Sequence, residues 1–161
     1  MLYSVKLATC LVLASLAFSD LFSRRLPNRA VIIVAGLYCV AAALVPISAA
    51  VFFSHVALAA AAFAVAALLF RFGWIAGGDA KLSAAIFLWA GPHLAAAVFV
   101  IVSVCGLILG LAVIAADLLY RRINALRWLS CLSRARGVPY GVALALGGGA
   151  VVAVASSGPQ P

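Results

Sequence analysis

The sequence predicts an all-α integral membrane protein that crosses the bilayer about six times. Hydrophobic residues make up 68% of the 161 residues, and charged residues make up only 9%. Soluble domains are typically about half apolar and a quarter charged, so this composition excludes them. A spanning helix needs about 20 apolar residues, and six of them use roughly 120 residues. What remains is enough for loops and tails only, which predicts a single membrane domain over residues 1–161.

Apolar runs interrupted by Pro, Gly and charged residues give the positions of the predicted spans. The spans are expected at roughly 2–19, 30–45, 49–70, 80–91, 94–116 and 141–157. Residues 1–19 resemble a signal peptide, but the chain after them is itself apolar, so we interpret them as an uncleaved first span. Short turns at Pro46 and at Gly91-Pro92-His93 are expected to join the second span to the third and the fourth to the fifth.

Basic residues predict the orientation of the spans. Ten of the eleven Lys and Arg side chains follow the first, third and fifth spans, and Lys6 is the exception. By the positive-inside rule these loops face the cytoplasm, and an even number of spans places both termini on the other side. The net charge of +8 is explained by this asymmetry and by attraction to anionic lipid headgroups, so a nucleic-acid partner is not required.

The loop over residues 117–140 is the only long one. Leucine and isoleucine residues recur in it near helical spacing, with arginines between them and Trp128 suited to a membrane interface. This pattern indicates either an amphipathic helix on the inner membrane surface or a helical extension of the fifth span.

The chain contains no glutamate and only three aspartates. Asp20 closes the first predicted span and Asp79 opens the fourth, so both are expected at the cytoplasmic edge of the membrane. An acidic residue costs on the order of 2.5–3.5 kcal/mol at mid-bilayer and less near the interface, so it is usually retained for function. Two carboxyl groups in a low-dielectric cleft share one proton, and such a pair can hydrolyse a peptide with water as the nucleophile and without a metal or cofactor.

A purely structural role is the alternative for each aspartate. Asp20 could cap a helix or pair with Arg24 or Arg25, and Asp79 could be a helix N-cap. Asp117 stands four residues before Arg121, the spacing of a helical ion pair, so we interpret it as structural.

Other catalytic chemistries have less support in the sequence. Serine catalysis would need a histidine base, but His55 and His93 fall on the outer side, away from the loops that carry the other candidate functional residues. No glycine-rich phosphate loop is present, and the four cysteines are scattered without ligand spacing. The sequence therefore predicts neither a metal site nor a disulfide framework.

Three short motifs carry a resemblance to a known family. Asp20 followed by Arg25-Leu26-Pro27-Asn28 is similar to the first signature of prepilin peptidases, the type IV leader peptidases. The second signature, Gly-x-Gly-Asp-x-Lys, is resembled by Ala76-Gly77-Gly78-Asp79-Ala80-Lys81. Residues 138–141, Val-Pro-Tyr-Gly, are similar to the motif that opens the last span of that family.

The resemblance implies an integral-membrane aspartyl protease of the GxGD type. Such an enzyme would remove the basic leader from prepilins or pseudopilins at the cytoplasmic face of the bacterial inner membrane. Asp20 and Asp79 match the family's catalytic pair, and Gly77 and Gly78 would give the backbone freedom to bring Asp79 towards Asp20. The resemblance gives supporting roles to four further residues: Pro27 and Asn28 in the turn, Lys81 in placing Asp79 or the substrate, and Arg25.

Two departures from the family pattern refine this interpretation. Ala76 replaces the first Gly of the second signature. The long family members carry a cytoplasmic insertion with paired CxxC zinc motifs linked to N-methylation, but here the link between the first two spans has no Cys. The chain therefore resembles the short, peptidase-only form found with tight-adherence (Flp) pili. The archaeal preflagellin peptidases share the Asp pair, so membership of that group is the alternative.

Two functions of other classes are alternatives for this sequence. A small proton-coupled transporter would use the two aspartates as relay groups, but such sites usually lie near the midplane of the bilayer. A non-catalytic assembly subunit would leave the motifs around Asp20 and Asp79 unexplained. The sequence does not predict an oligomeric state.

Overall fold

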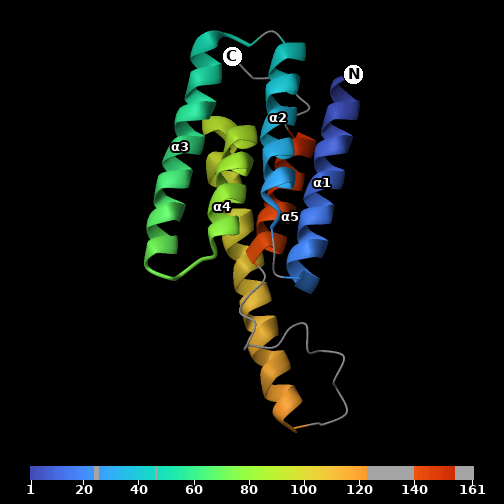
Figure 1. Ribbon diagram of the computed structural model, residues 1–161, viewed down its shortest axis with the longest axis vertical. Helices are drawn as coiled ribbons and strands as arrows, with labels where there is room; N and C mark the ends of the chain where they lie inside the picture. The colour runs from blue at the N-terminus through green and yellow to red at the C-terminus, as the bar shows by residue number, and fades with distance from the viewer. Residues whose placement is uncertain (24–25, 46, 123–139, 155–161) are drawn as a thin grey trace.

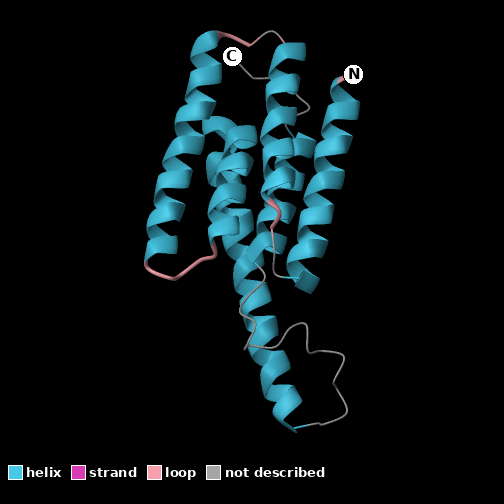
Figure 2. Ribbon diagram, viewed as in Figure 1, coloured by secondary structure: helices cyan, strands magenta, loops and turns pink. Residues whose placement is uncertain are grey.

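The helices begin and end close to the predicted boundaries. The computed structural model describes residues 1–23, 26–45, 47–122 and 140–154, and all regular secondary structure in these ranges is helical (Figure 2). The helices are α1 (Leu2–Ser23), α2 (Asn28–Leu44), α3 (Ala49–Arg71), α4 (Gly77–Arg122) and α5 (Tyr140–Val154). The predicted all-α class is confirmed.

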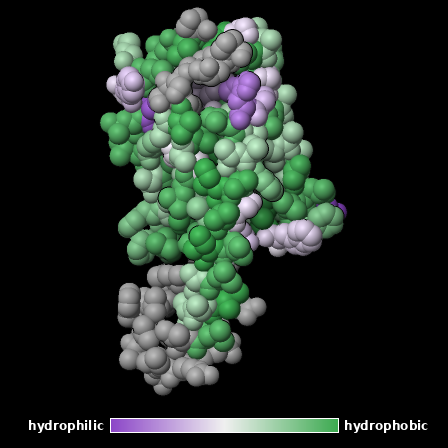
Figure 3. All heavy atoms as spheres, turned by 180° about the vertical axis from the view of Figure 1, so that it is seen from behind, coloured by the Kyte–Doolittle hydropathy of each residue, from purple (hydrophilic) through white to green (hydrophobic). Residues whose placement is uncertain are grey.

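The outer surface of the helix bundle is apolar. Phe53, Val65 and Phe99 are among many large hydrophobic side chains that are exposed, and Figure 3 shows apolar residues over most of one face. A surface of this kind is covered by lipid, so the chain is an integral membrane protein. In the described ranges, α1, α3 and residues Gly77–Ala116 of α4 are long and apolar enough to span a bilayer, whereas α2 and α5 are shorter. Length alone therefore gives three candidate spans rather than the predicted six.

The turn predicted at residues 91–93 is a sharp break inside α4. Gly91 is the non-helical residue of this run, with φ 58° and ψ 179°, and the chain reverses direction there so that α4 has two arms (Figure 1). Pro92 has no N–H to donate to the carbonyl of Leu88 one turn earlier. His55 of α3 supplies that donor, with its Nδ1 2.9 Å from the Leu88 oxygen.

Helix α5 lies between α1 and α4, and α3 packs on the outer side of α4 (Figure 1). Gly148 shows how closely these helices approach, because a Cβ atom there would lie 3.0 Å from Ile86 of α4 and 3.2 Å from Leu13 of α1. Small residues permit such close packing between membrane helices. The indole of Trp89 connects α4 to α2 by a buried hydrogen bond of 2.9 Å to the carbonyl of Val34.

Three boundaries differ from the prediction. Helix α1 continues to Ser23, so Asp20 lies within the last turns of the helix rather than at its end. No Gly or Pro lies between Asp20 and Pro27, so nothing in this sequence ends the helix at Asp20. Pro27 is the first residue that does so, because proline disfavours helix at the residue before it. Helix α4 begins at Gly77 rather than residue 80. It continues through Arg122, so the start of the long loop is a helical extension of the fifth predicted span. Residues 123–139, which carry most of the predicted amphipathic segment, lie outside the described residues.

Candidate active site

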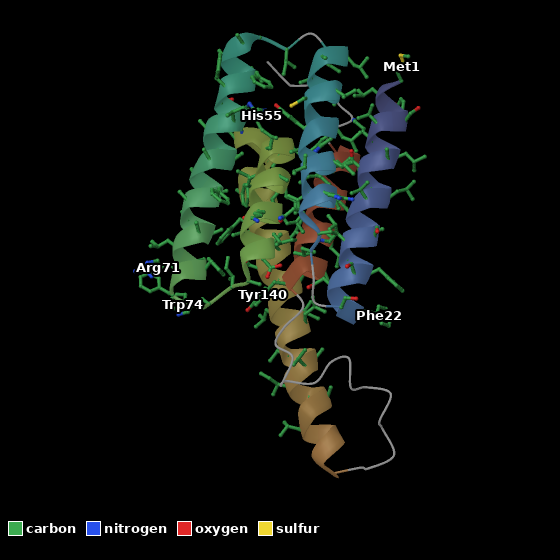
Figure 4. All side chains as sticks on the ribbon, viewed as in Figure 1. Met1, Phe22, His55, Arg71, Trp74 and Tyr140 are labelled. Atoms are coloured by element: carbon green, nitrogen blue, oxygen red, sulfur yellow. The ribbon has the colours of Figure 1, made fainter. Side chains whose placement is uncertain are left out.

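Five helix ends meet at one end of the bundle. Helices α1 and α3 end there, and α2, α4 and α5 begin there. In Figure 4, Phe22, Arg71, Trp74 and Tyr140 mark this end, and Met1 lies at the opposite end. Asp20 lies just before Phe22 in the chain, and Asp79 follows the loop that contains Trp74. The fold therefore brings the two aspartates, which are far apart in sequence, to the same end.

A cavity of about 640 Å³ lies between the ends of these helices. It is lined by Ser19, Asp20, Ser23, Leu26, Pro27, Asn28, Ala76, Gly78 and Asp79. The volume falls within the range of roughly 300–1,000 Å³ that is usual for ligand-binding cavities. The predicted residues Asp20, Pro27, Asn28, Gly78 and Asp79 are thus brought together around one space.

Both aspartate side chains are buried. Asp20 and Asp79 are each 6% exposed, and among the described residues the other buried polar side chains are those of Lys6 and Thr9. Asp20 continues the buried stripe of α1, which also contains Leu13 and Leu16. Burying a carboxyl group is unfavourable unless the surroundings compensate, so an interior position is unusual for a simple surface cap. The burial of both groups at one cavity favours a chemical role.

Asp79 is placed by the first turn of α4. Gly77 and Gly78, expected to give the backbone unusual freedom, lie inside this helical turn, and the positive φ angles among the described glycines are at Gly73 and Gly91 instead. Close approach explains the need for glycine at position 78. A Cβ atom there would lie 2.9 Å from the Cβ of Leu26, so its absence lets the segment after α1 pack against α4.

Asn28 and Lys81 connect the beginnings of α2 and α4. The ammonium group of Lys81 donates a hydrogen bond of 3.0 Å to the side-chain oxygen of Asn28. Pro27 is the N-cap of α2, and its carbonyl accepts a 3.0 Å hydrogen bond from the amide of Ala30. The bond between Lys81 and Asn28 therefore holds the two helices on either side of the cavity. Arg25, the remaining predicted support residue, lies outside the described residues.

Breaking this hydrogen bond is expected to slow a reaction at the cavity modestly. Lys81→Met and Asn28→Ala should each cost about 1 kcal/mol, or roughly a fivefold lower rate, because both side chains are exposed. The double variant should be no slower than either single variant, since both remove the same bond. Arg29→Met is the matched control and should react at the parental rate. Losses that multiply in the double variant would show that the two residues act separately.

Sequence reasoning missed one close neighbour of Asp20. Gly141, in the first turn of α5, is buried, and a Cβ atom there would lie 2.9 Å from both Cγ and Oδ2 of Asp20. The Val-Pro-Tyr-Gly motif marked this position, but spacing along the chain gave no sign of its partner. Ser19 and Ser23 also line the cavity, and no motif distinguished them.

The remaining candidates lie away from the cavity or outside the described side chains. Asp117 is in α4 near its far end, and its side chain is not among those described. Cys10, Cys39 and Cys105 are free thiols. Among the described residues, no group of three or more His, Cys, Asp or Glu side chains is arranged to hold a metal ion.

Comparison with known protein families identifies the chain. A model of the type IV leader peptidase family matches residues 7–111, which is well over half of the chain. The chain belongs to the type IV leader peptidase family. Searches of curated proteins and of solved structures found no match.

The family match includes every residue that lines the cavity. Both aspartates, the Pro27-Asn28 pair and Lys81 lie within the matched residues, whereas Gly141 lies beyond them. This leader peptidase is therefore a membrane protease of a family whose substrates are prepilins, and the resemblance seen in its sequence is confirmed at the level of the family.

Proposed function

We propose that this leader peptidase is an aspartic endopeptidase in which Asp20 and Asp79 form the catalytic pair. It removes the basic leader of type IV prepilins or pseudopilins and acts without a metal or cofactor. The observation that carries the proposal is that both carboxyl groups, from α1 and α4, are buried and line one cavity. Asp20 and Asp79 are also the aspartates in the two motifs that resemble the family signatures.

The reaction follows from a pair that shares one proton. The ionised carboxylate accepts a proton from a water molecule, whose oxygen attacks the scissile carbonyl carbon. The protonated carboxyl group donates to the carbonyl oxygen, so that a neutral tetrahedral intermediate forms. Its collapse breaks the C–N bond: the proton taken from water passes to the leaving amine, and a hydroxyl group of the intermediate returns a proton to the other carboxylate, which restores the shared proton. The free carboxyl end stays on the leader, and the amine becomes the new N-terminus of the pilin.

The proposed topology has six membrane crossings, with the arms of α4 on either side of Gly91 counted separately. The reversal of the chain at Gly91 supports this division. The basic residues near the ends of α1, α3 and α4 support a cytoplasmic position for the cavity in the bacterial inner membrane. Both termini then lie on the non-cytoplasmic side, and residues 1–161 form one membrane domain.

The proposed enzyme lacks N-methyltransferase activity. Only residues 24–27 lie between α1 and α2, and no cysteine is among them. This link leaves no space for the zinc-binding insertion that the resemblance associates with methylation.

Co-expression with a prepilin tests the proposal. The prepilin should lose its leader, which a gel shift detects, and mass spectrometry should find an unmodified N-terminus on the mature subunit. A chelator should leave the cleavage rate of the purified protein unchanged. An uncleaved prepilin would contradict the peptidase proposal, and a methylated N-terminus in cells without another methyltransferase would contradict the peptidase-only form.

A further inference from the structure

The carboxyl group of Asp20 lies against the backbone of α5. Its Cγ and Oδ2 are each 2.9 Å, and its Cβ is 3.0 Å, from the place where a Cβ atom of residue 141 would stand. Real Cβ atoms are not found this close to other heavy atoms. The side chain of Asp20 therefore occupies space that is open only because residue 141 is glycine.

Helix α5 has little room to move away from Asp20. A Cβ atom at Gly147 of α5 would lie 2.6 Å from Cγ2 of Val102 in α4, so α5 packs closely against α4 there. Farther along α5, Gly148 fits tightly between Leu13 and Ile86. Because these contacts hold α5 closely against its neighbours, a side chain at position 141 would displace the carboxyl group of Asp20 rather than the helix.

We infer that Gly141 is a positioning residue for the leader peptidase, a role that rests on the proposed function of Asp20. The bare backbone of Gly141 forms a wall of the Asp20 site and holds the carboxyl group at the cavity that it shares with Asp79. Through this contact the last helix contributes to the geometry of the pair without touching the substrate.

The substitution Gly141→Ala tests this role in a cleavage assay with a purified prepilin. We expect kcat to fall by about 10²-fold, because a shift of about 1 Å at a reacting group has effects of this size. KM should be unchanged, since the residue does not contact the substrate. Gly149→Ala, in the same helix, is the matched control and should keep the parental kcat, because nothing lies within 4 Å of its added Cβ.

A second control separates positioning from loss of stability. Gly148→Ala crowds Ile86 and Leu13 in the middle of the bundle. It should lower the midpoint of thermal unfolding in detergent while leaving kcat close to the parental value. If Gly148→Ala and Gly141→Ala lower kcat equally, tight packing of α5 in general explains the effect and the inference is overturned.

A double variant tests the contact without relying on activity. Gly141→Ala should lower the unfolding midpoint in the parental protein but by less than half as much in an Asp20→Ala background, where Cγ and Oδ2 are absent. An equal loss of the unfolding midpoint in both backgrounds would overturn the inference. This comparison also decides the case in which Gly141→Ala is too unstable for the cleavage assay.

The outcomes distinguish this inference from the proposed function. A parental protein that cleaves no prepilin contradicts the function, and the unfolding comparison still decides whether Gly141 holds Asp20. A parental protein that cleaves, with Gly141→Ala as fast as Gly149→Ala, overturns the inference and leaves the function intact.

Discussion

Asp20→Asn and Asp79→Asn are each expected to lower the rate of leader cleavage by at least about 10³-fold. Asparagine keeps the size of the side chain but can neither accept the proton of the attacking water nor hold the shared proton. Both residues line the same cavity and are equally buried, and because asparagine has nearly the same shape as aspartate, neither change should prevent folding. Gel-shift analysis of a co-expressed prepilin gives the cleavage, and membrane fractionation gives the amount of inserted protein.

Asp117→Asn is the matched control for this experiment. It makes the same chemical change in the third acidic residue of the chain, far from the cavity along α4. We expect it to retain most of the parental activity. If an Asp20 or Asp79 variant processes the prepilin as fast as the Asp117 variant, the catalytic assignment is wrong.

Gly91→Ala is expected to lower the free energy of unfolding by about 2–6 kcal/mol, the sum of two penalties. The first is backbone strain, because φ at Gly91 is 58° and residues with a Cβ atom avoid this region. The second is steric overlap, because a Cβ atom there would collide with the ring of His55. The His55 ring also stacks on Tyr38, with centroids 5.6 Å apart, so it cannot move away freely. Reversible unfolding in mixed detergent micelles measures the loss.

Two glycine variants separate these penalties. Gly73 has φ 75° and nothing within 4 Å of an added Cβ, so Gly73→Ala measures backbone strain alone. Gly110 lies in α4 with open space around it, so Gly110→Ala should be neutral or slightly stabilising. If the Gly91→Ala protein is no less stable than the Gly73→Ala protein, steric overlap with the His55 ring adds no penalty at position 91.

Most of the helical architecture could be predicted because a membrane imposes simple requirements on a sequence. Backbone groups must be satisfied within each segment, so apolar runs between Pro, Gly and charges become helices. The break at Gly91 was predictable from Gly91-Pro92 for the same reason. The pairing of His55 with the Leu88 carbonyl was not, because it joins α3 to α4 and depends on how the helices pack. The end of α1 was also placed too early, since Asp20 is polar but does not stop a helix.

The position of the candidate site could be predicted in part. Asp20 and Asp79 were identifiable because acidic residues are so rare in this chain, and charge asymmetry placed both at one membrane edge. The functions of the glycines were harder to predict. Gly78 permits the approach of Leu26, and Gly141 permits the approach of Asp20, and both contacts lie between segments distant in sequence. A motif can mark such a position, but only the fold shows which side chain occupies the space that glycine leaves.

The central claim is that Asp20 and Asp79 act as one catalytic unit, and residual cleavage rates test it most directly. Purified parental protein, the two single Asp→Asn variants and the double variant are compared on one prepilin, with rates corrected for cleavage in the absence of enzyme. Since both residues are needed for the same step, the double variant should be no slower than either single variant. Single variants that remain active, or losses that multiply in the double variant, would contradict a shared catalytic pair.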